Sequence, residues 1–184
     1  MSFTHCLLVI LGALGLATAG ARFPSRAPSS GIASEDTLRF ARTDTAIVSI
    51  PTGGEWPARF DVGIVVLRGA NGLVEALQEE PQSQSGDWSL AYRHTFDARG
   101  RTTSYESVGQ FFGGDCGAGV VRVRLAISYD TTFRATAREH TYRDRKGVPV
   151  DSVTCGKVYE FFDGEPAPSF EALVQRGRAP RQLP

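Results

Sequence analysis

The sequence predicts a mainly β protein, an antiparallel meander that forms a sandwich or an open barrel, with two short helices. Apolar and polar residues alternate with the two-residue period of half-buried strands, most clearly over residues 88–92 and 121–129. Two turns, at residues 97–100 and 144–147, carry Asp in the first and Gly in the fourth position, which is typical of a type I turn that closes a bulged hairpin. These patterns predict consecutive hairpins.

The first elements precede the regular part of the chain. Short strands are expected over residues 46–50 and 59–67, because both are apolar and the first is followed by turn residues. Asn71 is then expected to cap a short helix that carries Leu73, Val74 and Leu77 on one face.

The second half is expected to continue as strands and to end in a helix. The predicted strands span residues 88–92, 102–112, 121–129, 132–142 and 148–162. Ser169 is a suitable N-cap for the terminal helix, Leu173 and Val174 supply its packing face, and Gly177 stops it.

The N-terminal residues predict export. Residues 7–16 form an uninterrupted apolar run, and Ala17, Thr18 and Ala19 follow it as a small-residue cleavage site. A spanning helix needs about 20 strongly apolar residues, so we expect a signal peptide and no stable membrane span after its cleavage. The protein is then secreted or periplasmic.

The remaining chain is interpreted as one domain. The predicted divisions are a signal peptide over residues 1–19, a flexible lead-in over 20–44, a single β-rich domain over 45–177 and a polar tail over 178–184. The 20 Lys and Arg residues balance the 20 Asp and Glu residues. This balance gives no attraction to nucleic acid or to an anionic membrane.

Two cysteines remain after removal of the leader. Cys116 and Cys155 are expected to form a disulfide in an oxidising compartment. The alternative is zinc binding together with His94 and His140, but the chain has no closely spaced Cys or His pair. We therefore predict no metal and no cofactor.

The glycine-rich segment around Cys116 suggests a second use for that residue. Its sequence Gly-Asp-Cys-Gly, residues 114–117, resembles the nucleophile loop of the picornaviral chymotrypsin-like cysteine proteases. The resemblance implies a Cys116 thiolate in an oxyanion hole and an upstream histidine, here His94, as the base, but the family's next glycine is Ala118 here. His140 is the other candidate base for a hydrolase that uses Cys116. The alternative interpretation is a turn whose cysteine is held in a disulfide.

Hairpin register also places each histidine beside a serine. Counting from the two turns sets His94 near Ser104 and His140 near Ser152. Serines in the middle of strands lack an oxyanion hole, so these are expected to be ordinary cross-strand pairs on the surface.

The hairpin over residues 120–142 predicts a basic sheet face. If an odd-length loop such as residues 130–132 lets its apolar residues share one face, Arg124 lies roughly opposite Arg138 on the other. Such like charges need neutralisation, either by the carboxylates of Glu106 and Glu160 or by an anionic ligand. The residues of this predicted arginine face are Arg122, Arg124, Arg134, Arg138 and His140.

These observations favour a non-catalytic binding or interaction module of the cell envelope or the extracellular space. Its expected partner is an anionic small molecule on the arginine face or an envelope protein docked to a strand edge. The alternative is a secreted hydrolase with Cys116 as nucleophile.

Overall fold

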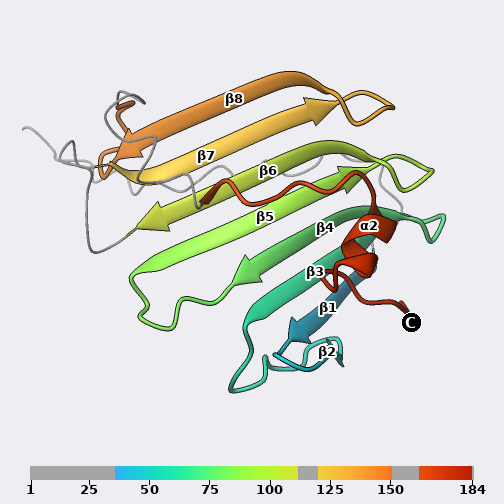
Figure 1. Cartoon of the computed structure of the whole chain (residues 1–184). Helices are drawn as coiled ribbons and strands as arrows, with labels where there is room; N and C mark the ends of the chain where they lie inside the picture. Colours follow the sequence, from blue (N-terminus) through green and yellow to red (C-terminus); the bar gives the residue numbers. More distant parts are fainter. Residues whose placement is uncertain (1–35, 112–119, 151–161, 184) are drawn as a thin grey trace, which may run out of the picture. The chain divides into compact units, whose positions relative to one another are not determined.

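Eight antiparallel strands form one open sheet in the computed structural model, which describes residues 36–111, 120–150 and 162–183 (Figure 1). The strand order is β2-β1-β3-β4-β5-β6-β7-β8, a meander after the first two strands. Within the described residues there is neither a second sheet nor closure into a barrel. The strands are β1 (Asp36–Arg42), β2 (Ile47–Ile50), β3 (Val62–Arg68), β4 (Val74–Pro81), β5 (Trp88–Phe96), β6 (Thr102–Phe111), β7 (Val120–Tyr129) and β8 (Ala135–Asp144).

The sheet begins earlier in the chain than expected. β1 lies within the range that composition indicated as a flexible lead-in, and it pairs with both β2 and β3. Leu38 and Phe40 alternate with Thr37 and Arg39, and both Phe40 and Ala41 are buried. This alternation extends over too few apolar residues to stand out beside the Pro- and Ser-rich stretch that precedes it.

The helix expected after Asn71 is a strand instead. Asn71 Oδ1 accepts a hydrogen bond from the Leu73 N–H, and Gly69 N–H donates to Leu73 O, so these residues close a hairpin turn. Gly72 takes a φ of 75°, which a helix does not allow. The Asn that suggested a helix cap therefore caps a turn, and β4 follows directly.

The two Asp-Gly turns form as predicted. Asp97 O accepts from Gly100 N–H, and Asp97 N–H donates to Arg101 O. The same two bonds join Asp144 to Gly147 and Val148, and both glycines have positive φ.

A third turn, between β7 and β8, has the same main-chain hydrogen bonds although it has no glycine. Asp130 O accepts from Phe133 N–H and Asp130 N–H donates to Arg134 O, as in the other two turns. Phe133 takes a φ of 62° where the other turns have glycine, and its ring stacks on Tyr129 at 4.3 Å. The loop therefore consists of residues 131–133 and lies one residue later than the loop of residues 130–132 on which the predicted arginine face depends.

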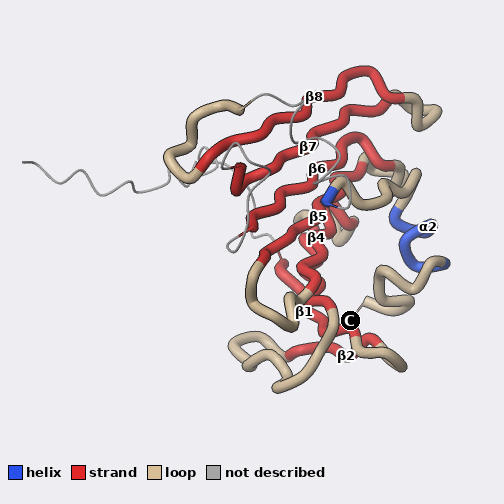
Figure 2. Tube along the Cα trace, turned by 60° about the vertical axis from the view of Figure 1, so that its left-hand side comes forward, coloured by secondary structure: helices blue, strands red, loops and turns tan. Residues whose placement is uncertain are grey.

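The C-terminal residues cover one face of the sheet, which we call the covered face. Residues 162–168 run along β6 and β5, and α2 (Phe170–Gln175) follows (Figures 1 and 2). Side chains of β6 hold the main chain of this segment: Thr102 Oγ1 donates to Ala167 O at 2.6 Å, and Tyr105 Oη donates to Asp163 O at 2.6 Å. These side chains provide hydrogen-bond partners for main-chain carbonyl groups that do not take part in the sheet.

The terminal helix is confirmed, and the residues after it are not a free tail. Ser169 Oγ accepts from the Ala172 N–H as the N-cap, Leu173 is buried and Gly177 has a φ of 68°. Ala179 is also buried, although it lies in the expected polar tail. The main core under α2 contains Phe40, Val62, Ile64, Val66, Leu77, Phe96, Ala167, Leu173 and Ala179.

Candidate functional site

The predicted arginine face does not assemble, because the register of β7 and β8 differs from the expected one. Arg124 pairs with Thr141, whereas Arg138 pairs with Ile127. Residues directly opposite each other share a face, so Arg138 and His140 lie with the apolar residues on the covered face. Arg122 and Arg124 lie on the opposite face.

Two features of the hairpin cause this shift. The turn at Asp130 takes in Arg134, which therefore precedes β8. The register also slips between Ser128 and Tyr129, because these neighbours pair with Ala137 and Ala135. An odd displacement exchanges the two faces of a strand.

Carboxylates neutralise the arginine on the opposite face. Arg124 Nε donates to Glu106 Oε1 at 2.6 Å, and its Nη1 donates to Glu139 Oε2 at 3.1 Å. The hydrogen bond with Glu106 raises the pKa of Arg124. Glu106 was one of the two neutralising residues expected from the sequence, and Glu160 lies outside the described residues.

The two other members of the predicted face meet an aspartate of the C-terminal segment. His140 Nε2 lies 3.1 Å from Asp163 Oδ1, and Arg138 Nη2 lies 3.6 Å from Asp163 Oδ2. This cluster joins β8 to the segment that crosses the sheet. The cluster stabilises the fold, and Asp163 is the partner of both Arg138 and His140 within the protein.

His94 is not a surface residue beside Ser104, as expected, but is fully buried and pairs with Tyr105. A register slip between Thr95 and Phe96 moves it by one position. His94 Nε2 accepts a hydrogen bond from the Ala167 N–H at 3.2 Å. Burial, reinforced by the charge of Arg178, lowers the pKa of His94 to about 3. The imidazole is therefore a neutral structural acceptor at physiological pH.

The proposed partners of the histidines cannot be placed with them. Cys116, Cys155 and Ser152 lie outside the described residues. The expected disulfide, the cysteine nucleophile and the second His–Ser pair therefore remain predictions. Among the described residues, no group of three His, Cys, Asp or Glu side chains has the arrangement of a metal site.

A cleft of about 770 Å³ lies between the β1–β2 hairpin and the residues that follow α2. Its apolar wall includes Phe40, Ile47 and Val174. Its volume falls in the range of roughly 300–1,000 Å³ that is typical of small-ligand sites. It is the candidate site with the most room for a ligand among the described clefts.

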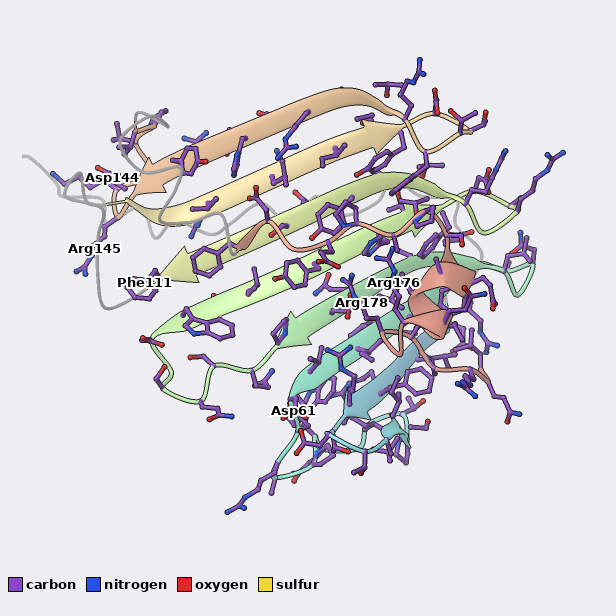
Figure 3. All side chains as sticks on the ribbon, viewed as in Figure 1. Asp61, Phe111, Asp144, Arg145, Arg176 and Arg178 are labelled. Atoms are coloured by element: carbon purple, nitrogen blue, oxygen red, sulfur yellow. The ribbon has the colours of Figure 1, made fainter. Side chains whose placement is uncertain are left out.

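Charge around this cleft is of one sign. Arg176 and Arg181 line it, both are exposed, and neither guanidinium has a hydrogen bond or an ion pair with a described residue. Asp and Glu are absent from the described residues that line the cleft. Figure 3 shows Arg176 at the end of α2, beside Arg178. These two neighbours differ, because Arg178 is bound to Glu79 and Arg176 is free to meet a ligand.

The amino-acid sequence did not predict this site, because its two arginines belong to segments without a strong pattern. Arg176 falls at the end of the predicted helix and Arg181 in the expected tail. The opposite wall of the cleft is formed by β1 and β2. In the sequence, only the alternation of Leu38 and Phe40 with polar residues and the apolar run at Ile47 indicate these strands.

Comparison of the chain with protein-family models, with curated proteins and with solved structures finds no match. In the described part of the chain, no helix has the length and apolar character needed to cross a bilayer. The functional interpretation therefore depends on the geometry of the cleft.

Proposed function

We propose that this chain is an exported, non-catalytic binding module that takes an anionic ligand with an apolar part in the cleft between the β1–β2 hairpin and the residues after α2. The observation that carries the proposal is the pair of unpartnered guanidiniums, Arg176 and Arg181, on an apolar cleft whose described lining has no acidic residue. Export is proposed from the leader sequence alone.

The two parts of such a ligand have separate contacts. An apolar group packs on Phe40, Ile47 and Val174, where each square ångström removed from water contributes about 25 cal/mol. A carboxylate, sulfonate or phosphate accepts charge-assisted hydrogen bonds from Arg176 and Arg181. Because both arginines are exposed, we expect this attraction to weaken as salt concentration rises.

A binding role is favoured over catalysis by the state of the two described histidines. His94 is buried and bound to Ala167, and His140 is engaged with Asp163. Neither lines the cleft. The hydrolase alternative depends on Cys116, and no described feature favours it.

Fluorescence titration with anilinonaphthalene sulfonate, an apolar anion, tests this function. We expect saturable binding to the wild-type protein and a loss of at least about tenfold in affinity for Arg176→Gln/Arg181→Gln. The matched control is Arg59→Gln/Arg99→Gln, which removes the same charge from two exposed residues outside the cleft. An equal loss of dye affinity in both variants would attribute that loss to the change in net charge and would reject the cleft as the binding site.

A further inference from the structure

We propose that the ligand is an extended acidic peptide, which binds as an additional strand along β2 with alternate side chains in the cleft. This inference rests on the proposed function, since it uses the same cleft, and it names the class of partner. Four observations on β2 and its surroundings support it.

The first observation is the position of β2 at the end of the sheet. It pairs with β1 on one side, and no described strand lies on its other side. An edge of this kind presents unpaired main-chain donors and acceptors to a further strand.

The second observation is the direction of those main-chain groups. Thr43 N–H donates to Ala46 O at the hairpin turn, and the next pair along the ladder is Arg42 with Ile47. Arg42 O accepts from Asp61 N–H and so points away from β2. Since bonded and non-bonded pairs alternate, the N–H and C=O groups of Ile47 and Ser49 point outward from the sheet edge.

The third observation is the distribution of side chains on β2. Ile47 and Ser49, whose main chains point outward, also line the cleft. Val48 points to the other face of the sheet and is 43% exposed, one of the few large apolar side chains so exposed among the described residues. A strand added to this edge would cover Val48 and direct every second side chain into the cleft.

The fourth observation is the charge of the cleft. Arg176 and Arg181 face the space beside β2 and have no described partner, whereas the nearby Arg42 is 3.6 Å from Glu79. Because these two guanidiniums lie where every second side chain of an added strand would point, they favour acidic side chains at those positions. The partner is therefore an extended segment whose acidic side chains enter the cleft, where their methylene groups contact the apolar wall, and whose alternate apolar side chains lie over Val48.

The test uses the full chain and a short blocked peptide that alternates valine and glutamate. We expect binding to slow hydrogen exchange at the Ile47 and Ser49 amides by at least about tenfold. Ser49→Pro removes an outward N–H that β1 does not use, so it should leave the β1–β2 pairing intact. The expected result is at least about a tenfold loss of peptide affinity for Ser49→Pro and a clearly smaller loss for Ser49→Ala, which changes the same side chain but keeps the main-chain N–H.

A second peptide, N-methylated on the edge that would face β2, makes the same test without changing the protein. Loss of its affinity relative to the unmethylated peptide, with both measured on the wild-type protein, would support strand addition. Peptide binding that is insensitive to Ser49→Pro and to N-methylation would overturn strand addition and leave the proposed function standing. Binding of the dye but not of the peptide would overturn the peptide partner, whereas failure of both in the wild-type protein would reject the cleft itself.

Discussion

The Glu79 carboxylate and the Arg178 guanidinium form a two-pronged ion pair that joins β4 to the residues after α2. Arg178 Nη2 donates to Glu79 Oε2 at 2.6 Å, and its Nε lies 3.1 Å from the same oxygen. Glu79 is 2% exposed, so its negative charge is stabilised almost entirely by groups of the protein and not by water. The pair holds the residues that form one wall of the cleft.

Arg178→Met should strongly destabilise the protein. The substitution leaves a buried carboxylate without its main partner, and breaking a buried ion pair in this way costs roughly 3–5 kcal/mol. Urea denaturation of the wild-type protein and the variant measures the loss.

Two further variants separate this effect from loss of packing. Arg178→Met/Glu79→Gln should recover part of the stability, because no charge is then left buried. Arg124→Gln removes an exposed arginine that also binds two carboxylates, and it should cost less than about 1 kcal/mol. Equal losses for Arg178→Met and Arg124→Gln would contradict the buried status of the Glu79 pair.

His94 should make the protein less stable below neutral pH. Its pKa is about 3 in the folded chain against 6.5 for the free side chain. Above pH 6.5 neither state binds the proton; as pH falls below this value the unfolded chain takes it up while the folded chain does not. Stability should therefore fall by about 2 kcal/mol between about pH 7 and pH 5.

His94→Gln provides the comparison, since glutamine can still accept from the Ala167 N–H and does not titrate. Its free energy of unfolding should change less than that of the wild-type protein over the same pH interval. The same pH dependence in both proteins would assign the loss to other groups.

The close approach of the C-terminal segment to β5 and β6 predicts a sensitive glycine. Gly164 has a φ of 65°, and a Cβ there would lie 2.4 Å from Tyr105 Oη and from Tyr92 Cε1. Gly164→Ala should cost about 1–2 kcal/mol for the backbone and about 1–3 kcal/mol more for the overlap. Gly100→Ala is matched for positive φ but has open space around its Cβ, so it should show the backbone cost alone in thermal unfolding.

Local signals in the sequence predicted the two Asp-Gly turns and the terminal helix correctly. Asp97 and Gly100 determine their turn by their own side chains and backbone freedom, and Ser169 determines the start of α2 in the same way. Such choices depend on a few neighbouring residues, which are visible in the sequence.

Features that depend on distant contacts were not predictable in the same way. Phe133 adopts the left-handed conformation while it stacks on Tyr129, and this turn lies one residue later than expected. The register slip between Ser128 and Tyr129 then exchanges the two faces of β8. The burial of His94 depends on Ala167, far along the chain. The cleft is likewise formed by segments that only the fold brings together.

Export and the expected disulfide predict a characteristic mass. The protein produced with its own leader should be cleaved near Ala19, and Cys116 and Cys155 should react with an alkylating reagent only after reduction. Reduction should lower stability by roughly 3–4 kcal/mol in the chain-entropy account of a loop of about 40 residues. Intact-mass spectrometry decides the point, and alkylation of the processed protein without reduction would instead favour Cys116 as a nucleophile.

The location of the bound anion is the most direct test of the binding cleft. Amide chemical shifts of the isotope-labelled protein should be followed by NMR while anilinonaphthalene sulfonate is added. We predict saturable changes at Ser49, Gly177 and Gln182, which line the cleft, and their loss in Arg176→Gln/Arg181→Gln. Changes confined to Arg122 and Arg124 on the opposite face, or no saturable change, would contradict the assignment of the cleft as the binding site.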